Sequence, residues 1–388
     1  MHHVAGVPLR ERWPSMSGSQ YPKCVQAICM TMQQLAALEF PAYGSIYFED
    51  APLGSEVKIP LSDGFCIGPH CSTVYWDCGV DGSEMGKIVR GSAGKDLAAY
   101  ASGLIANGHS KLPSTSSPIT ASRPSYFGTV QEHHKLLDSA EGILQTLIAQ
   151  PQIANASAPT LLHADLHTRN IYVSDEDPTS ITCVIDWQSS TIEPAFIYAS
   201  DMPDFARAPE TSSEEGNPGP EPPLSEQDKM QKVASYCNQT YEICMQHFIP
   251  KMRVARSLDA LLTRPFQYTH TSWRDSAAAL RQEFLDLSSN WENLDLAGPC
   301  PYIASPEELA RHQKQHRAFE RAQELKQMLM KLLFVESDGW VSTEDWEEVR
   351  RAHKAIYDLA LENAEEEGDD SMTEKNLKEL WPFDDGKF

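Results

Sequence analysis

The stretch "LLHADLHTRNIYV" (residues 161–173) sets two histidines, an aspartate, an arginine and an asparagine between two short apolar runs. Strands are predicted around it at 160–163, 171–174 and 181–186, because these segments are apolar and a turn-forming "DEDPTS" lies between the last two. Functional side chains are often carried by loops that a rigid scaffold positions. The stretch therefore predicts an active-site loop between buried strands.

The loop follows the H-R-D-L-x-x-x-N spacing of a kinase catalytic loop, with Ala164 in place of the arginine. His163, Asp165 and Asn170 stand at the positions of the histidine, the aspartate and the asparagine. Phosphoryl transfer needs a carboxylate that orients the attacking hydroxyl and accepts its proton, and it needs oxygen ligands for magnesium. Asp165 and Asn170 are candidates for these two roles.

A second candidate carboxylate follows on the next predicted hairpin. In "CVIDWQ" (183–188), Asp186 ends an apolar strand at the place where kinases carry the aspartate of D-F-G, and Trp187 and Gln188 replace the Phe and Gly. Magnesium favours oxygen ligands, usually one or two carboxylates with phosphate oxygens and water. The sequence therefore predicts that Asp165, Asn170 and Asp186 face one open cleft.

Two other interpretations of the loop stay open. In the first, its polar side chains only cap the strands. In the second, His163, Asp165 and His167 bind zinc, because alternate residues of a strand share a face and both residue types ligate that metal. Neither interpretation explains Asn170 or the second hairpin. We group His163 with Asp165 as a catalytic-loop residue, and we expect His163 and His167 to shape the loop by hydrogen bonds.

Composition excludes several classes of partner. The chain has 388 residues, 41% of them hydrophobic and 22% charged, which is typical of a globular protein. Its net charge of −23 argues against nucleic acid or an anionic membrane as partner, and it would suit a cationic substrate. Several acids lie in segments predicted to be linker or tail, such as "AEEEGDD" (364–370). No apolar run approaches the ~18 residues of a membrane span. The sequence leaves the oligomeric state open.

Cysteine usage indicates a reducing compartment. The nine cysteines are odd in number and include no C-x-x-C pair, so they do not form a disulfide framework. One cluster, Cys66, Cys71 and Cys78 with His70, could in principle bind zinc, but it lacks the close ligand pairs of a structural site. The first residues, "MHHVAGVPLRERW", match neither a secretory signal nor a transit peptide. We therefore expect an intracellular protein.

Helices are predicted over most of the remaining chain from apolar residues at three- and four-residue steps. The fold class is therefore α+β and mostly helical, with the 160–186 hairpins lying against helix 127–149. Capping boxes are predicted at Ser225 with Asp228, and at Ser342 with Asp345. The chain divides into a catalytic core (1–205), a flexible Pro/Glu-rich linker (206–223) and a helical subdomain with an acidic tail (224–388). Segment 40–120 is predicted to be irregular, and the main predicted helices are 17–38, 127–149, 277–291 and 306–334, with another beginning after 224 and one after 342.

At this point a family resemblance is clear. "HADLHTRNIYV" followed by "VIDWQSSTIEPAF" resembles the Brenner motif and metal-binding aspartate of the aminoglycoside phosphotransferase and choline kinase-like superfamily. The form "IDWQ…P" is most similar to the fungal phosphotransferases of the type called altered inheritance of mitochondria protein nine. The resemblance spans nearly the whole chain, through "GVPLRERW" (6–13), "FPAYGSIYF" (40–48), "FCIGP" (65–69), "DGWV" (338–341) and "LWPF" (380–383).

The resemblance implies the C-terminal lobe of a protein-kinase-like fold with a small catalytic β-hairpin region. It implies ATP-dependent phosphoryl transfer to a small-molecule hydroxyl, with Mg²⁺ and ATP bound. Asp165 would be the catalytic base, and Asn170 and Asp186 would bind magnesium and the nucleotide phosphates. The name of the fungal group suggests mitochondria, although no targeting segment supports that location.

The chain departs from the family at its beginning. "MHHVAGVPL" resembles the hinge between the two kinase lobes, and no G-x-G-x-x-G occurs. "GSAGKD" (91–96) is predicted to be a loop and helix start, so Lys95 is not expected to replace the lysine of the small lobe. We therefore expect the N-terminal lobe to be missing and the chain as written to be inactive. The alternative is a non-catalytic pseudokinase remnant that binds a small molecule or a protein partner.

Overall fold

The computed structural model describes residues 5–62, 64–72, 75, 94–113, 123–208, 226–335, 341–367, 377 and 381–382. Helices dominate these residues, and the strands form small antiparallel sheets, which confirms an α+β, mostly helical fold. No described helix is both long and apolar enough to cross a membrane. Most of the predicted linker (209–223), Cys78 and the Ser225 cap lie outside the described residues.

The long predicted helices are confirmed, since amphipathic periodicity fixes where they form. Helix α4 begins at a capping box in which Thr129 Oγ1 accepts from the backbone N–H of Glu132. Just before α12, Ser342 Oγ accepts from the backbone N–H of Asp345 and donates to the Asp345 carboxylate, which is the predicted pairing. The longer helices are α2 (Gln20–Ala36), α3 (Leu97–Ser110), α4 (Val130–Ile148), α6 (Glu226–Phe248), α8 (Ala260–Thr269), α10 (Ala277–Ser289), α11 (Pro306–Leu333) and α12 (Trp346–Glu367); the shorter ones are α1 (Leu9–Arg12), α5 (Pro151–Ala156), α7 (Pro250–Arg256) and α9 (Ser272–Asp275).

The eight described strands form three separate sheets. The first sheet, in the order β1-β6-β7, contains the predicted hairpin. The predicted strand at 160–163 is β5, and it pairs with β8 instead of joining that hairpin. The strands are β1 (Val7–Pro8), β2 (Ser45–Phe48), β3 (Ile59–Ser62), β4 (Phe65–Gly68), β5 (Pro159–Leu161), β6 (Ile171–Val173), β7 (Ile181–Val184) and β8 (Ile192–Pro194), and the third sheet has the order β2-β4-β3.

Strands β2, β3 and β4 and helix α3 correct the prediction that 40–120 is irregular. Asp96, inside "GSAGKD", accepts a hydrogen bond from the backbone N–H of Ala99 at 2.8 Å and so caps α3. Gly94 pairs with Tyr43 through a backbone bridge. The described part of "GSAGKD" is thus the loop and helix start that the sequence predicts.

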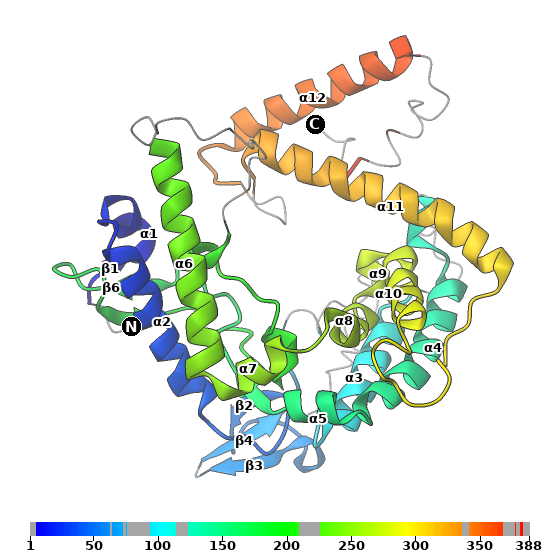
Figure 1. The fold of residues 1–388 in the computed structure, drawn as a ribbon, viewed down its shortest axis with the longest axis horizontal. Helices are drawn as coiled ribbons and strands as arrows, with labels where there is room; N and C mark the ends of the chain where they lie inside the picture. Colours follow the sequence, from blue (N-terminus) through cyan, green and yellow to red (C-terminus); the bar gives the residue numbers. More distant parts are fainter. Residues whose placement is uncertain are drawn as a thin grey trace.

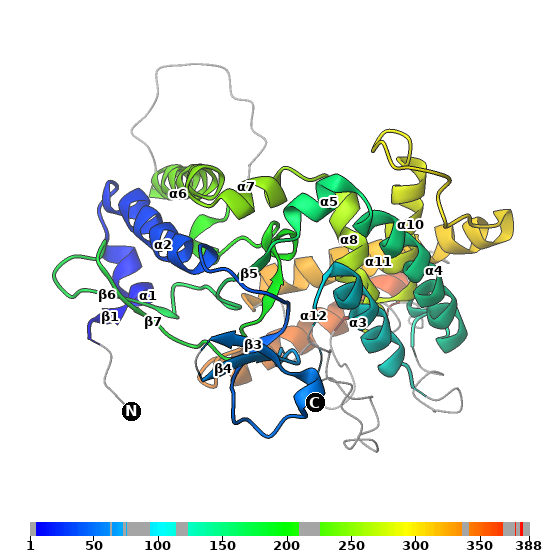
Figure 2. The same cartoon turned by 90° about the horizontal axis from the view of Figure 1, so that it is seen from below.

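Two apolar cores hold the helices and sheets together. The larger joins α4, α8 and α10, and the second lies between α2, α6 and the strand β6 (Figure 1 and Figure 2). Ile171 and Val173 of β6 are fully buried in this second core. The prediction that the hairpins lie against helix 127–149 is therefore wrong. The apolar face of α4 is covered by α8 and α10, and α2 supplies the face that covers the hairpin.

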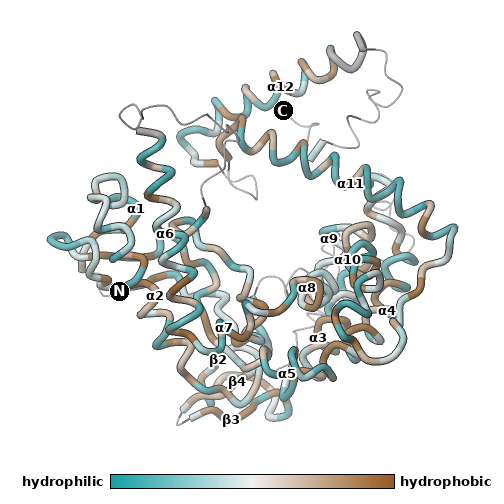
Figure 3. The backbone as a smooth tube through the Cα atoms, in the orientation of Figure 1, coloured by the Kyte–Doolittle hydropathy of each residue, from teal (hydrophilic) through white to brown (hydrophobic). Residues whose placement is uncertain are grey.

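Helix α11 extends from the α4–α10 group as a long arm, and α12 runs back beside it (Figure 1). Much of this arm is hydrophilic, whereas hydrophobic segments gather along α2 and around α8 and α10 (Figure 3). A small core of its own, formed by Leu329, Leu333, Tyr357, Leu377 and Trp381, joins α11, α12 and the described C-terminal residues. The arm is thus a local packing unit that is attached to the body through α10.

Candidate active site

The loop between β5 and β6 folds back on itself through its own backbone. The N–H of His167 donates to the carbonyl of Asp165 at 3.0 Å, and the N–H of Asn170 donates to the carbonyl of His167 at 2.9 Å. These turns bring the Asn170 amide nitrogen Nδ2 within 2.8 Å of the Asp165 carbonyl and 3.1 Å of its carboxylate. The structure therefore places Asp165 and Asn170 side by side, as their spacing predicts.

His163 holds this loop in shape through both of its ring nitrogens. Its ring accepts at Nδ1 from the N–H of Asp165 (3.1 Å) and contacts the carbonyl of Ile185 with Nε2 (2.8 Å). The ring also packs edge-on against Trp187, with 4.7 Å between centroids. Both nitrogens are engaged by the backbone, so His163 offers no free lone pair to a metal. This geometry contradicts the zinc interpretation of His163, Asp165 and His167.

The carboxylate of Asp165 is surrounded by donors. His167 Nε2 lies 2.9 Å from Oδ1, and Arg169 Nη2 lies 3.0 Å from Oδ2, which also accepts from Asn170. Partial burial alone would raise the pKa of Asp165, but the Arg169 hydrogen bond and the nearby His167 and Arg169 lower it overall. Asp165 is therefore a carboxylate at neutral pH and can accept a proton.

Asp186 directly follows Ile185, whose backbone N–H and carbonyl both contact residues of the loop. Ile185 donates its N–H to the carbonyl of Asn170 at 2.9 Å, and its own carbonyl contacts His163. The backbone of Asp186 is left-handed, with φ 71°, a conformation that Asp and Asn tolerate better than most residues. The backbone thus joins the ends of the two predicted motifs.

Asn170 and Asp186 have the chemistry of magnesium ligands. Among the described residues, none hydrogen-bonds the Asp186 carboxylate or donates to Asn170 Oδ1, so both can offer oxygen to a cation. One carboxylate and one amide oxygen suit Mg²⁺, which completes its shell with water and phosphate oxygens. Within the described ranges, no group of three or more His, Cys, Asp or Glu side chains could hold a metal ion. The residues present fit magnesium shared with a substrate better than a closed metal cage.

Two cavities of appreciable volume adjoin the loop in the described part of the chain. The larger has a volume of about 880 Å³ and the smaller about 220 Å³, and both are lined by Ala164, Tyr198 and Asp201. Asp165 lines the smaller cavity, whereas Asn170 and Asp186 line neither of the two. The prediction of a single cleft shared by all three residues is therefore not met by these cavities. Asp165 faces the smaller cavity, and Asn170 and Asp186 stand apart from the walls of both.

Glu193, which the sequence did not single out, is buried in the wall of the larger cavity. Its Oε1 accepts from Thr191 Oγ1 (2.8 Å) and lies 3.3 Å from His70 Nδ1, while Oε2 has no hydrogen-bond partner among the described residues. Burial would raise the pKa of Glu193, but the His70 ring and hydrogen bonds lower it overall. The available signal was an acid inside an apolar segment, "TIEPAF". His70, predicted beside a cysteine cluster, instead contacts this carboxylate.

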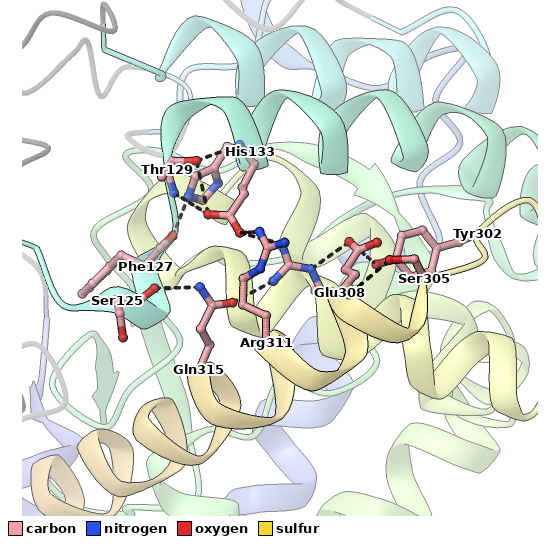
Figure 4. A network of polar contacts seen from close by, with 11 residues as sticks. Ser125, Phe127, Thr129, His133, Tyr302, Ser305, Glu308, Arg311 and Gln315 are labelled. Atoms are coloured by element: carbon pink, nitrogen blue, oxygen red, sulfur yellow. Dashed lines mark hydrogen bonds and ion pairs between the residues drawn. The ribbon is translucent and has the colours of Figure 1, made fainter.

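A polar network joins α4, α10 and α11 (Figure 4). Arg281 of α10 is buried and contacts Glu132 of α4 at 3.4 Å and Gln315 of α11 at 3.1 Å. Gln315 also donates to the carbonyl of Ser125 at 3.0 Å. The lining of the larger cavity on either side of this network includes Tyr126, Phe127, Phe319 and Lys326. The buried guanidinium of Arg281 therefore links α10 to α4 and α11.

Comparison with known proteins finds relatives for the segment that carries this loop. Residues 113–197, which include the loop, Asp186 and Glu193, match the phosphotransferase enzyme family APH. Two relatives, subtelomeric hrmA-associated cluster proteins of two Aspergillus fumigatus strains, are each 27% identical over 230 residues. That alignment covers 51% of this chain and 44% of each relative, so the chain spans about half the length of the curated relatives it matches. No solved structure matches significantly. The segment that carries the kinase-like loop motif is thus similar to the phosphotransferase enzyme family.

Proposed function

We propose that this chain carries the catalytic site for transfer of the terminal phosphoryl group of ATP to a hydroxyl of a small molecule. The observation that carries the proposal is the carboxylate of Asp165. It lies in a segment that matches the phosphotransferase enzyme family, is ionised at neutral pH and lines a cavity that adjoins a second, larger one. A base for this reaction must meet the acceptor hydroxyl within hydrogen-bond reach, and the smaller cavity gives a hydroxyl access to Asp165.

Asp165 would orient the hydroxyl and take its proton as the oxygen attacks phosphorus. His163 fixes the loop to the carbonyl of Ile185 through its Nε2. Asn170 Nδ2 donates to Oδ2 of the Asp165 carboxylate and so holds it in place. Asn170 and Asp186 would hold magnesium, which when bound neutralises phosphate charge. Because these two residues line neither cavity, we place the nucleotide on their side of Asp165, with its terminal phosphorus next to the acceptor hydroxyl, so that the bond to ADP breaks as the new P–O bond forms.

The body of the acceptor is proposed to lie in the larger cavity, and its reacting hydroxyl in the smaller one, because the two cavities share Ala164, Tyr198 and Asp201 as lining residues. Aromatic rings and a buried carboxylate line the larger cavity, among them Tyr75, Tyr100, Tyr198, His270 and Glu193. Rings provide apolar area for a small molecule, and the buried carboxylate of Glu193 places negative charge in the cavity wall. The net charge of −23 also disfavours an anionic polymer as acceptor.

The test is ATP consumption with Mg²⁺ and a panel of amino-sugar, choline and sugar acceptors. The chain is measured alone and as the longer product specified by in-frame coding sequence upstream of Met1. In the kinase pattern a small lobe supplies the phosphate-covering loop and its lysine, so we expect turnover to be greater in a form that carries such a lobe. Turnover with at least one acceptor should appear once that lobe precedes the chain.

Asp165→Asn in the active form should lose about 100-fold or more of this turnover, the low end of the range for a general base. Asp177→Asn, in the exposed turn of the same hairpin, is the matched control and should retain activity. Saturable acceptor binding without ATP consumption in either form would instead support a binding module.

A further inference from the structure

The direction of the Asp165 carboxylate depends on a neighbouring imidazole. Of its two oxygens, Oδ2 is occupied by Arg169 and Asn170. Oδ1 lies 2.9 Å from His167 Nε2, and no other described residue hydrogen-bonds it or pairs with it. Oδ1 is therefore the oxygen with room for an acceptor hydroxyl, and its direction is set by where the imidazole of His167 stands.

His167 stands between two carboxylates. Its other ring nitrogen, Nδ1, lies 3.7 Å from Asp204 Oδ2, beyond a hydrogen bond but within ion-pair distance. Asp204 begins the short helix η7 (Asp204–Ala206), 36 positions after Thr168. No sequence pattern joins these two segments, so the second carboxylate is a contribution of the tertiary structure.

Asp204 is itself held firmly against the loop. Its two oxygens accept from the backbone N–H of Thr168 at 3.1 and 3.2 Å, and Oδ2 accepts from Thr168 Oγ1 at 2.7 Å. Oδ1 also accepts from the N–H of Phe205 at 2.8 Å. Because Thr168 follows His167 directly, these bonds fix the backbone from which the imidazole projects.

The segment that carries Asp204 also forms a wall of the smaller cavity, through Tyr198, Asp201, Met202 and Pro203. We propose that Asp204, through Thr168 and His167, is a latch that holds the Asp165 carboxylate in the direction of the smaller cavity, where the acceptor hydroxyl would lie. His167 and Asp204 are thus positioning residues. The inference rests on the proposed function for its catalytic consequence, but the latch itself can be tested without turnover.

The first arm of the experiment measures amide hydrogen exchange at Thr168 in the full chain. Asp204→Ala removes the acceptor of this N–H, so we expect its exchange to become about 10-fold faster or more, while the global unfolding free energy changes little. Asp138→Ala is the matched control, because Asp138 lies 3.6 Å from His109 in an exposed pair remote from the loop. Unchanged exchange at Thr168 in Asp204→Ala would overturn the latch.

The second arm measures kcat and KM for MgATP. It uses the acceptor and the form of the protein that gave turnover in the ATP-consumption test. Misplacement of a catalytic group by about 1 Å costs about 100-fold, so we expect that loss in kcat for His167→Ala and Asp204→Ala, with KM nearly unchanged. His167→Gln keeps a side-chain N–H donor and should recover much of the activity. Unchanged kcat in His167→Ala would overturn the positioning role. Absence of turnover in every form would defeat the proposed function, and the exchange arm would still decide the latch.

Discussion

Asp186 shows how a single residue can combine backbone and charge requirements. Asn shares the tolerance of Asp for its left-handed conformation (φ 71°), so Asp186→Asn removes charge with little backbone strain. A neutral amide oxygen attracts Mg²⁺ less than a carboxylate does, so we expect this variant to need at least about 10-fold more Mg²⁺ for half-maximal turnover. A magnesium titration of ATP consumption measures the shift. An unchanged requirement would remove Asp186 from the proposed ligand set.

His133 gives a prediction for the pH dependence of stability. It is fully buried, its Nε2 lies 2.7 Å from the carbonyl of Phe127, and burial lowers its pKa to about 4. Since the folded pKa lies below the ordinary value of about 6.5, the stabilisation is complete above pH 6.5 and is lost as the pH falls toward 4. The full loss is roughly 3 kcal/mol.

Urea unfolding of the chain at pH 7.5 and pH 5 measures this effect. His270 and His312 also have pKa values lowered to about 4 by burial, so the contribution of His133 is the difference between the chain and His133→Gln. We expect the variant to show a weaker dependence on pH. His247→Gln, on the exposed side of α6, is the control and should follow the unmodified chain.

At the scale of elements, Glu132 joins a helix cap to a buried charge. It closes the capping box of α4 and lies 3.4 Å from the buried Arg281. Loss of the Thr129 cap in Thr129→Ala should cost about 1 kcal/mol of unfolding free energy. Glu132→Gln should cost about 3 kcal/mol, because it also removes a charge partner of Arg281. Urea unfolding measures both, and Glu141→Gln, exposed on the same helix, should change stability by less than about 0.5 kcal/mol. Equal effects of the first two variants would contradict this role of Arg281.

Local patterns made some elements predictable and left others hidden. Helices α2 and α4 follow from their three- and four-residue apolar steps, and the β6–β7 hairpin follows from its turn residues. The pairing of β5 with β8 joins segments separated by that hairpin, and no local signal specifies it. Helix α8 was missed because Pro265 inside it indicates a helix break.

The candidate site divides in the same way. Asp165, Asn170 and Asp186 were predictable because a motif fixes their spacing. Glu193 and Asp204 were not, because their contacts with His70 and Thr168 depend on how distant segments pack. The chemistry of the loop is therefore local, and the shape and charge of its surroundings are set by the tertiary structure.

At the scale of the whole molecule, the larger core joins residues from both sides of segment 206–223. Leu136 and Leu144 of α4 share it with Phe266 of α8 and with Leu280 and Phe284 of α10. We expect Phe266→Ala to cost about 3–5 kcal/mol and both parts to unfold in one transition. Unfolding followed by tryptophan fluorescence and by circular dichroism tests this, with the exposed Leu332→Ala as control. Two separate transitions would show that the parts are independent.

The edge strand β1 has a consequence for the time at which the catalytic loop is completed during folding. Val7 and Pro8 pair with β6, the N–H of Arg10 donates to the carbonyl of Thr168, and Arg12 reaches the carbonyl of Asp175, 163 positions away. Closing so long a stretch of chain is entropically costly, and such non-local contacts form slowly. A refolding chain should therefore regain its helical signal before it regains an ordered loop around Asp165, because that loop must wait for a strand that lies far away in the sequence.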